Sequence, residues 1–290
     1  MTLKRILVSA ALLALVAGSQ THAAVLISDQ FNYANGDLTV TDGTGANVSG
    51  GNWAPYSGAS FTAESITVVN NQAELLISGS EDASRSIPNA GAEFMTAGET
   101  WYYGALVTVN DQRADPATTA IVNEYFMNLK DTSVSALRSR LYVNNPSTGT
   151  GGAGFRFGIG ASSGAGNAVN WGTDLAFGTQ YAVIASYEFD TGFAKLWVNP
   201  VTSGSANVTA TAAPNAGTFI SQLALRQAFS NGGVSGGPSV PNTQILVDAV
   251  SLAESFDEAL AALAVPEPTS AALSLVGLMG LSLGRRTRKA

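Results

Sequence analysis

The sequence predicts an all-β protein built as a two-sheet antiparallel β-sandwich, with an N-terminal signal helix and a C-terminal transmembrane helix. Its 290 residues include 31 glycines and 10 prolines, and each such residue inside a helix costs roughly 1 or 3 kcal/mol. Short segments alternate large apolar residues with small or polar ones, which is the period of a strand. The composition is 46% hydrophobic and 12% charged, which excludes a disordered chain.

Several segments show the strand alternation most clearly, at 101–110, 154–160, 181–190, 193–199 and 244–252. Residues 190–192, Asp-Thr-Gly, have the composition of a tight turn between two of them. A second hairpin is predicted over 65–78, because Asn70 and Asn71 tolerate a positive φ at its tip. Short strands separated by turns rather than by helices favour a sandwich over alternating strand and helix units.

The N-terminus has the charged, apolar and small-residue order of a secretory signal peptide. Lys4 and Arg5 precede an apolar run over 6–17, and Thr21 and Ala23 fit the small-x-small pattern of a cleavage site. We therefore expect cleavage after Ala23 and export of the remaining chain. An uncleaved N-terminal anchor is the alternative, but about twelve apolar residues are too few to span a bilayer.

The exported chain would lack the side chains of several catalytic classes. The sequence has no cysteine, and its single histidine, His22, leaves with the signal peptide. Thiolate and imidazole nucleophiles, zinc or copper sites and haem ligation are therefore excluded. Carboxylate acid and base chemistry stays open, as does binding of calcium, which takes carboxylate and carbonyl oxygens.

The C-terminus combines a short polar motif, an apolar segment and a basic end. Pro266, Glu267 and Pro268 precede an apolar stretch over 269–284, which as a helix spans about 24 Å against a hydrocarbon core of about 30 Å. A basic cluster closes the chain, formed by Arg285, Arg286, Arg288 and Lys289. Basic residues stay cytoplasmic, so the preceding chain would be delivered across the membrane. An ordinary buried helix that ends in arginines is the alternative.

This tail resembles the PEP-CTERM sorting signal, in which a Pro-Glu-Pro tripeptide, a short apolar span and an arginine cluster follow one another. The resemblance covers the last 26 residues, 265–290. It implies an exosortase-type processing enzyme as a partner, an inner-membrane intermediate and final placement at the cell surface or outside the cell. Both prolines keep the tripeptide extended and accessible to such an enzyme.

Between the two ends we expect one domain, which is an ordinary size for a β-sandwich. The predicted organisation is a signal peptide over 1–23, a β-sandwich over 24–256, a linker or short helix over 257–264, and a sorting signal over 265–290 with its transmembrane segment at 269–284. The part between the ends holds 20 acidic and eight basic residues, a net charge of −12. This charge excludes nucleic acid as a partner and favours divalent cations or neutral partners.

Several short segments resemble a concanavalin-A-like jelly roll of the laminin-G type. They are the Asp-Gln-Phe-Asn-Tyr run at 29–33, the Gly-Gly-Asn-Trp run at 50–53, the hairpin over 181–199 and the strand over 245–250. Members of that superfamily include carbohydrate-binding modules, adhesion domains and glycosidases. The resemblance therefore implies a fold and a carbohydrate context without choosing one function.

A catalytic carboxylate pair is incomplete in this sequence. Glu188 and Asp190 share one strand face, as in the Glu-x-Asp-x-Glu strand of laminarinase-type enzymes. Gly192 and Phe193 occupy the positions where those enzymes carry the further acid. Because one half of the pair is missing, we expect no catalytic residue.

Two kinds of binding residue are candidates instead. Asp190 and Asp248 lie near strand ends, where a structural calcium ion could bind. The aromatic residues beside Gly- and Asn-rich segments could stack on sugar rings, namely Trp53 and Trp171, with Tyr56 and Tyr142. No cofactor other than calcium is expected.

The sequence thus predicts a non-catalytic exported surface or extracellular-matrix protein with a structural or carbohydrate-binding jelly roll. Its partners would be the processing enzyme, exopolysaccharide or another glycan, and the membrane through the C-terminal segment. The alternative is a secreted, carboxylate-dependent polysaccharide-active enzyme, either a glycoside hydrolase or a lyase. A coat protein without any ligand is the third reading.

Overall fold

We analysed the protein as a computed structural model. It describes residues 24–39, 47–57, 65–76, 79, 81–88, 98–114, 124–149, 152–162, 168–212, 220–227 and 243–263. The signal peptide, the Pro-Glu-Pro motif, the segment 269–284 and the basic cluster all lie outside these residues. Among the described residues, no helix is long and apolar enough to cross a membrane.

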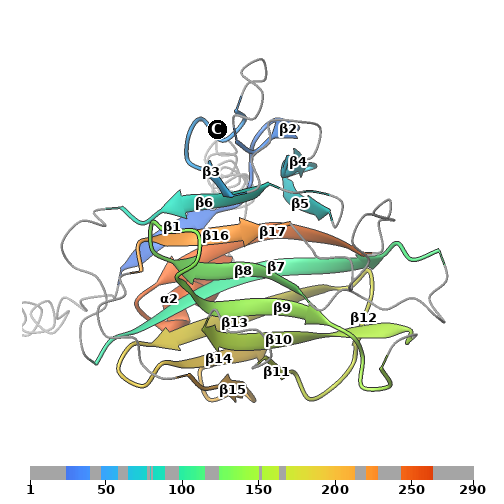
Figure 1. Cartoon of the computed structure of the whole chain (residues 1–290), viewed down its shortest axis with the longest axis vertical. Helices are drawn as coiled ribbons and strands as arrows, with labels where there is room; N and C mark the ends of the chain where they lie inside the picture. Colours follow the sequence, from blue (N-terminus) through green and yellow to red (C-terminus); the bar gives the residue numbers. More distant parts are fainter. Residues whose placement is uncertain are drawn as a thin grey trace, which may run out of the picture.

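The described strands form two antiparallel sheets (Figure 1). The nine-stranded sheet runs from one edge to the other through β15 (Val208–Ala210), β14 (Phe193–Val198), β13 (Gln180–Glu188), β7 (Thr100–Asp111), β17 (Thr243–Ala253), β5 (Gln72–Leu76), β4 (Thr67–Val69) and β2 (Gly36–Asp37), with β1 (Val25–Asp29) also on β17. Along the edge that faces away from β7, β17 pairs first with β5 and then with β1.

The eight-stranded sheet is the second layer of the sandwich. It runs through β11 (Val169–Asn170), β10 (Gly154–Ser162), β9 (Leu137–Asn144), β8 (Glu124–Lys130), β16 (Gln222–Arg226), β6 (Asp82–Ser86) and β3 (Ala54–Ser57), with β12 (Leu175–Ala176) also on β10. The two-sheet antiparallel sandwich predicted from the sequence is confirmed for the described residues.

One apolar core fills the space between the sheets. Val107, Val183 and Val247 of the nine-stranded sheet belong to the same buried cluster as Phe126 and Phe157 of the eight-stranded sheet. These residues occupy alternate positions along their strands, as the period of two requires. The inner faces of both sheets are therefore fully used for packing.

Both predicted hairpins are present. β13 pairs with β14 in continuous register from Val183 opposite Val198 to Glu188 opposite Phe193. β4 and β5 are joined by Asn70 and Asn71, whose φ angles are 52° and 62°. Asparagine tolerates this left-handed conformation better than most residues, which explains the position of the turn.

The segment predicted as a linker or short helix is a helix that packs on the sandwich. α2 (Phe256–Leu263) lies on the outer face of the nine-stranded sheet, where Phe256, Ala259 and Leu263 are buried with Ile184 and Trp197. In Figure 1 it is the orange-red ribbon beside β17. It therefore belongs to the domain rather than to a tether.

Close approach of the helix depends on a glycine in β7. A Cβ atom at Gly104 would lie 2.5 Å from Ile184 Cδ1 and 2.9 Å from Leu263 Cδ1, closer than atoms pack in protein interiors. Glycine at this position leaves the space that the last turn of α2 fills.

We expect Phe256→Ala to lower the free energy of unfolding by about 3 kcal/mol, because it empties a buried aromatic site. The centroid of the Phe256 ring is 5.1 Å from the centroid of the Trp197 ring and 6.0 Å from that of the Tyr102 ring. Urea unfolding measures the change. Val201→Ala is the matched control, since that side chain is 84% exposed and should change stability by less than about 0.5 kcal/mol. Equal effects of the two substitutions would show that α2 does not stabilise the domain.

Candidate functional site

The outer face of the eight-stranded sheet carries a cluster of tyrosine, cationic and amide side chains. Strand alternation places them there. In β9, Leu141 and Val143 point into the core, so Arg140 and Tyr142 point outward. The same alternation applies to β16, where Leu225 faces the core and Arg226 the outside. We call this group the polar face; it consists of Tyr56, Asp82, Glu124, Tyr125, Asn128, Lys130, Arg140, Tyr142 and Arg226.

Stacked aromatic and guanidinium groups form one half of the polar face. The rings of Tyr125 and Tyr142 lie edge to face, with their centroids 5.9 Å apart. Arg140 Cζ is 5.1 Å from the Tyr125 ring centroid and 5.2 Å from that of Tyr142. Arg226 Cζ lies 4.2 Å from the Tyr125 centroid and its NH1 donates to Glu124 Oε2 at 3.0 Å. These contacts hold both guanidinium planes in place.

A buried lysine forms the other half. Lys130 is 0% exposed, and its Nζ lies 4.4 Å from the ring centroid of Tyr56. The ammonium donates to Asp131 O at 2.6 Å and to Gln222 Oε1 at 2.5 Å. Both acceptors are neutral, so these hydrogen bonds bring no formal negative charge to the ammonium.

The hydroxyl of Tyr56 and Oδ1 of Asn128, both buried within the polar face, lack a hydrogen-bond partner. Asn128 Nδ2 donates to Leu129 O at 3.1 Å, so only the acceptor end of that amide lacks a partner. Buried polar atoms nearly always form a hydrogen bond, because a buried donor or acceptor without a partner costs about 1–3 kcal/mol. A polar ligand that reached these two atoms would supply the missing hydrogen bonds.

Burial changes the acid–base properties of the face. It raises the pKa of Tyr56, Tyr125 and Tyr142, so all three hydroxyls stay protonated and able to donate at neutral pH. Burial lowers the pKa of Lys130, because the ammonium loses hydration, although Asp131 and Asp82 oppose this effect. An anion placed beside Lys130 would favour its charged form.

The polar face carries positive charge in an otherwise acidic domain. Lys130, Arg140 and Arg226 face Asp82 and Glu124, so the described residues of the face hold three positive and two negative groups. The sequence-based expectation of cationic or neutral partners followed from the total charge of the domain and did not consider this local excess. Charges concentrated on one face act locally, because salt screens the more distant ones.

The neighbouring Arg156 forms an ion pair with Asp174. Arg156 Nε lies 2.5 Å from Asp174 Oδ1. Hydrogen bonds from the hydroxyl and N–H of Ser147, and then from Arg156, lower the pKa of Asp174 to about 2. Asp174 therefore stays ionised at neutral pH, and we leave Arg156 out of the polar face.

Glycines in β10 make room for side chains of the adjoining strands. A Cβ at Gly160 would lie 3.0 Å from the Tyr142 ring, and one at Gly158 would lie 2.4 Å from Asn144 Nδ2. Asn144 Nδ2 in turn donates to Asn170 Oδ1 at 2.6 Å. The glycines thus let side chains from β9 and β11 lie across β10 at the edge of the polar face.

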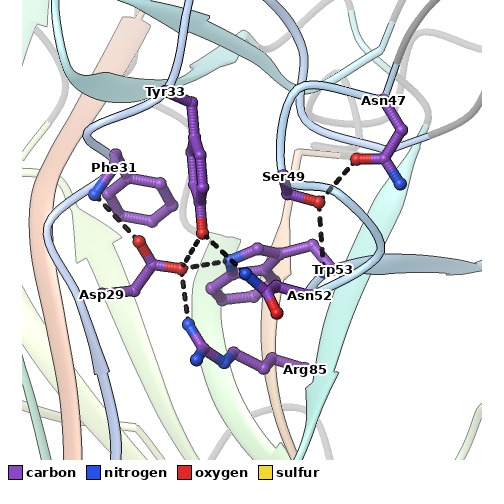
Figure 2. Close-up of polar contacts among 8 residues, drawn as sticks. All are labelled: Asp29, Phe31, Tyr33, Asn47, Ser49, Asn52, Trp53 and Arg85. Carbon is purple, nitrogen blue, oxygen red and sulfur yellow. Dashed lines mark hydrogen bonds and ion pairs between the residues drawn. The ribbon is translucent and has the colours of Figure 1, made fainter.

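Trp53 is not a sugar-stacking residue in this structure, which corrects the expectation from the sequence. It is 1% exposed, stacks on Phe31 with ring centroids 5.9 Å apart, and donates from Nε1 to Asp29 Oδ2 at 2.9 Å (Figure 2). A Gly- and Asn-rich flank indicates a turn but does not show which way the following ring points. Trp171 follows β11 and is half-buried. Its backbone N–H donates to Phe157 O at 2.8 Å.

Asp29 gathers the donors around Trp53 into one structural cluster (Figure 2). Its Oδ1 accepts from Phe31 N–H at 2.9 Å, and its Oδ2 accepts from the Tyr33 hydroxyl at 2.7 Å and from Arg85 NH1 at 2.5 Å. Burial and the Asp29 carboxylate raise the pKa of Tyr33 to about 12, against an opposing hydrogen bond with Asn52. The carboxylate already accepts from four groups, so it is suited to hold the chain rather than a ligand.

The remaining candidate carboxylates are dispersed. Asp190 Oδ2 accepts from Gly98 N–H at 2.7 Å, beside the turn between β13 and β14. Asp248 Oδ2 accepts from Gln180 Nε2 at 2.9 Å, and Asp248 is the extra residue of a β-bulge in β17. Glu188 ends β13 and is half-buried. Among the described residues, no three carboxylate or histidine side chains are grouped to hold a metal ion.

Sequence reasoning identified Tyr56 and Tyr142 as sugar-stacking candidates but missed Tyr125, Lys130 and Arg226. Tyr125 and Lys130 lie on β8 and Arg226 lies on β16, two strands far apart in sequence that only the sheet order brings together. One signal was present, since cationic, aromatic and amide residues alternate with apolar ones in β9. Without the neighbouring strands, that alternation reads as an ordinary solvated face.

No family model and no curated protein matches the chain. Solved structures show distant likenesses. A variant of the alginate lyase Aly36B in complex with alginate trisaccharide has a TM-score of 0.49 at 13% identity, covering 80% of this chain and 100% of that one. A CBM2 module of the evolved Dit protein of Lactobacillus casei BL23 phage J-1 has a TM-score of 0.43 at 12% identity, covering 80% and 96%.

A structure described as a sialidase has a TM-score of 0.43 at 15% identity, covering 80% of this chain. The match spans 19% of the sialidase chain, so this protein corresponds to a small part of it. These values assign no function. The sandwich architecture rests on the strand pairing, and the candidate site rests on the contacts of the polar face.

We expect Trp53→Phe to lower the free energy of unfolding by about 1–2 kcal/mol, because it removes one donor from the buried Asp29 carboxylate and keeps an aromatic ring on Phe31. Thermal or urea unfolding measures this change. Trp171→Phe is the control and should have a smaller effect, since Trp171 is only half-buried. If Trp53→Phe leaves stability unchanged but weakens polysaccharide binding, our assignment of Trp53 to a structural cluster is incorrect.

Proposed function

We propose that the protein is an exported, non-catalytic glycan-binding protein whose polar face receives an acidic polysaccharide. The observation that carries this proposal is the pair of buried polar atoms without partners, Tyr56 Oη and Asn128 Oδ1, beside the buried ammonium of Lys130. A sugar hydroxyl both donates and accepts hydrogen bonds, so one class of ligand satisfies both atoms. A sugar carboxylate would supply the negative charge that Lys130 lacks among its hydrogen-bond acceptors.

The aromatic half of the face supports a sugar ligand. Tyr125 is partly exposed, whereas Arg140 and Tyr142, which lie against its ring, are almost fully buried. An exposed tyrosine offers an apolar ring face to the C–H groups of a sugar and a hydroxyl to its oxygens. Because these buried side chains fix the Tyr125 ring, little side-chain freedom remains to be lost on binding.

The local positive charge of the polar face favours an acidic sugar. Arg226 keeps part of its guanidinium exposed while it is paired with Glu124, and guanidinium groups bind carboxylates through two parallel hydrogen bonds. A neutral glycan would leave the positive charge of the face uncompensated. A strongly anionic polymer would still be repelled by the rest of the domain, which restricts contact to this face.

Export and sorting complete the proposal. The signal peptide would direct the chain across the inner membrane, and the Pro-Glu-Pro segment would be processed by an exosortase-type enzyme at the membrane. The support comes from the order of charged, apolar and polar segments at both ends. The glycan-binding domain would then act at the cell surface or in the extracellular matrix.

We expect Arg226→Gln and Tyr125→Ala to weaken binding of polygalacturonate and alginate about tenfold, which corresponds to about 1.4 kcal/mol. Affinity electrophoresis in gels that contain each polymer measures the binding. Lys195→Gln is the matched control, because it removes a positive charge from β14 in the other sheet. Neutral dextran should bind weakly to all variants.

Two results would overturn the glycan proposal. One is that the unmodified protein binds none of these polymers at low salt. The other is that Lys195→Gln weakens binding as much as Arg226→Gln, which would indicate a diffuse charge effect. Circular dichroism and unfolding curves of each variant establish that loss of binding is not loss of fold.

The sorting proposal is tested by deleting 265–290 in a host that carries an exosortase-type system. We expect the shortened protein to be exported but to change its final location, because it lacks the apolar segment that holds it at the membrane. Fractionation and intact mass measure the outcome. Glu267→Ala separates the motif from the span and should block processing while it keeps the apolar segment. An unchanged location and an unchanged processing state after the deletion would refute this route.

A further inference from the structure

Two hydrogen bonds join the beginning of the described chain to Glu254, the residue that follows β17. Ala24 N–H donates to Glu254 Oε2 at 3.1 Å, and Glu254 N–H donates to Ala24 O at 3.2 Å. The next residue, Val25, is in register with Ala253 in the β1–β17 ladder. Among the described residues, Ala24 is therefore the first that is bonded next to the end of β17.

We propose that removal of the leader between Ala23 and Ala24 creates an α-ammonium group that forms an ion pair with Glu254, so that export processing completes this corner of the domain. The inference rests on the export part of the proposed function and does not involve the polar face. It assigns Glu254 as the receptor of the new N-terminus.

The chemistry of the step is hydrolysis of one peptide bond by water. The bond between the Ala23 carbonyl carbon and the Ala24 nitrogen breaks, hydroxide goes to the carbonyl carbon, and a proton goes to the nitrogen. At neutral pH the new amine, with an ordinary pKa of about 7.7–8.0, takes up a second proton. The atom that donated one hydrogen bond to Glu254 then carries a full positive charge beside the same carboxylate.

The ion pair requires cleavage at this bond rather than at a neighbouring one. Cleavage one residue earlier would place the ammonium on Ala23, about 3.8 Å further along the chain. Cleavage one residue later would remove Ala24 and both of its contacts with Glu254. Only a chain that begins at Ala24 puts the new charge on the atom that lies 3.1 Å from Oε2.

The same corner holds the helix that leads to the C-terminal segment. Ser255, next to Glu254, accepts from Glu258 N–H at 3.3 Å and donates to Glu258 Oε2 at 3.1 Å, which caps the start of α2. At the other end of α2, Gln30 Nε2 donates to Ala262 O at 3.1 Å. The proposed ion pair would therefore lie where β1, the end of β17 and the start of α2 meet.

The experiment uses the full chain, exported and processed in a Gram-negative host. Intact mass and N-terminal sequencing identify the first residue. Acylation of the α-amine is then followed between pH 6 and 9 by mass spectrometry of the N-terminal peptide, in the unmodified protein, in Glu254→Gln and in the control Asp257→Asn. Asp257 lies in the same region, in the first turn of α2.

We expect the chain to begin at Ala24, and its α-amine to react about three- to tenfold more slowly at pH 7 than that of Glu254→Gln. This difference corresponds to a rise of about 0.5–1 in the pKa of the amine beside a carboxylate. Asp257→Asn should react as the unmodified protein does. An N-terminus at any other residue, or equal reaction rates with and without the Glu254 carboxylate, would overturn the inference.

Failure here is distinguishable from failure of the glycan proposal. Glu254→Gln lies outside the polar face and should bind polygalacturonate as the unmodified protein does. If the amine rates behave as expected but no polymer binds, only the glycan proposal fails. If the polymer binds but the amine rates do not differ, only the ion pair fails.

Discussion

The structure depends on the hydrogen-bonding requirement of one long strand. β17 must satisfy the backbone groups along both of its edges, because a buried N–H or C=O without a partner is costly. β7 pairs with it along one edge, while β5 and then β1 share the other. Through these pairings, β17 joins the N-terminal strand, the first hairpin and the middle of the chain in one sheet.

This constraint also determines where α2 lies. The last residues of β17 lead directly into α2, and α2 covers the outer face of the nine-stranded sheet through Phe256 and Leu263. The outer face of the eight-stranded sheet lies on the opposite side of the sandwich and carries the polar face. The polar face and α2 therefore lie on opposite sides of the sandwich.

Two buried polar groups in this domain show how hydrogen-bond satisfaction separates structure from function. The Asp29 carboxylate accepts from Phe31, Tyr33, Trp53 and Arg85, and every one of these donors lies within the domain. Asn128 Oδ1, by contrast, is buried without any donor. A fully hydrogen-bonded buried network stabilises one conformation. A buried atom without a partner is instead stabilised when a ligand supplies the missing hydrogen bond.

The sequence by itself determined the β class, both hairpins and the strands at 101–110, 154–160 and 244–252, because alternation and turn residues are local properties of the chain. It also correctly placed Asn70 and Asn71 at a turn. Only the tertiary structure decided that Trp53 is buried on Asp29 and that α2 packs on a sheet. The polar face likewise required the sheet order, since Tyr56, Tyr125, Lys130 and Arg226 come from three strands, β3, β8 and β16. Contacts between distant segments depend on which strands pair, and local periodicity carries no information about that choice.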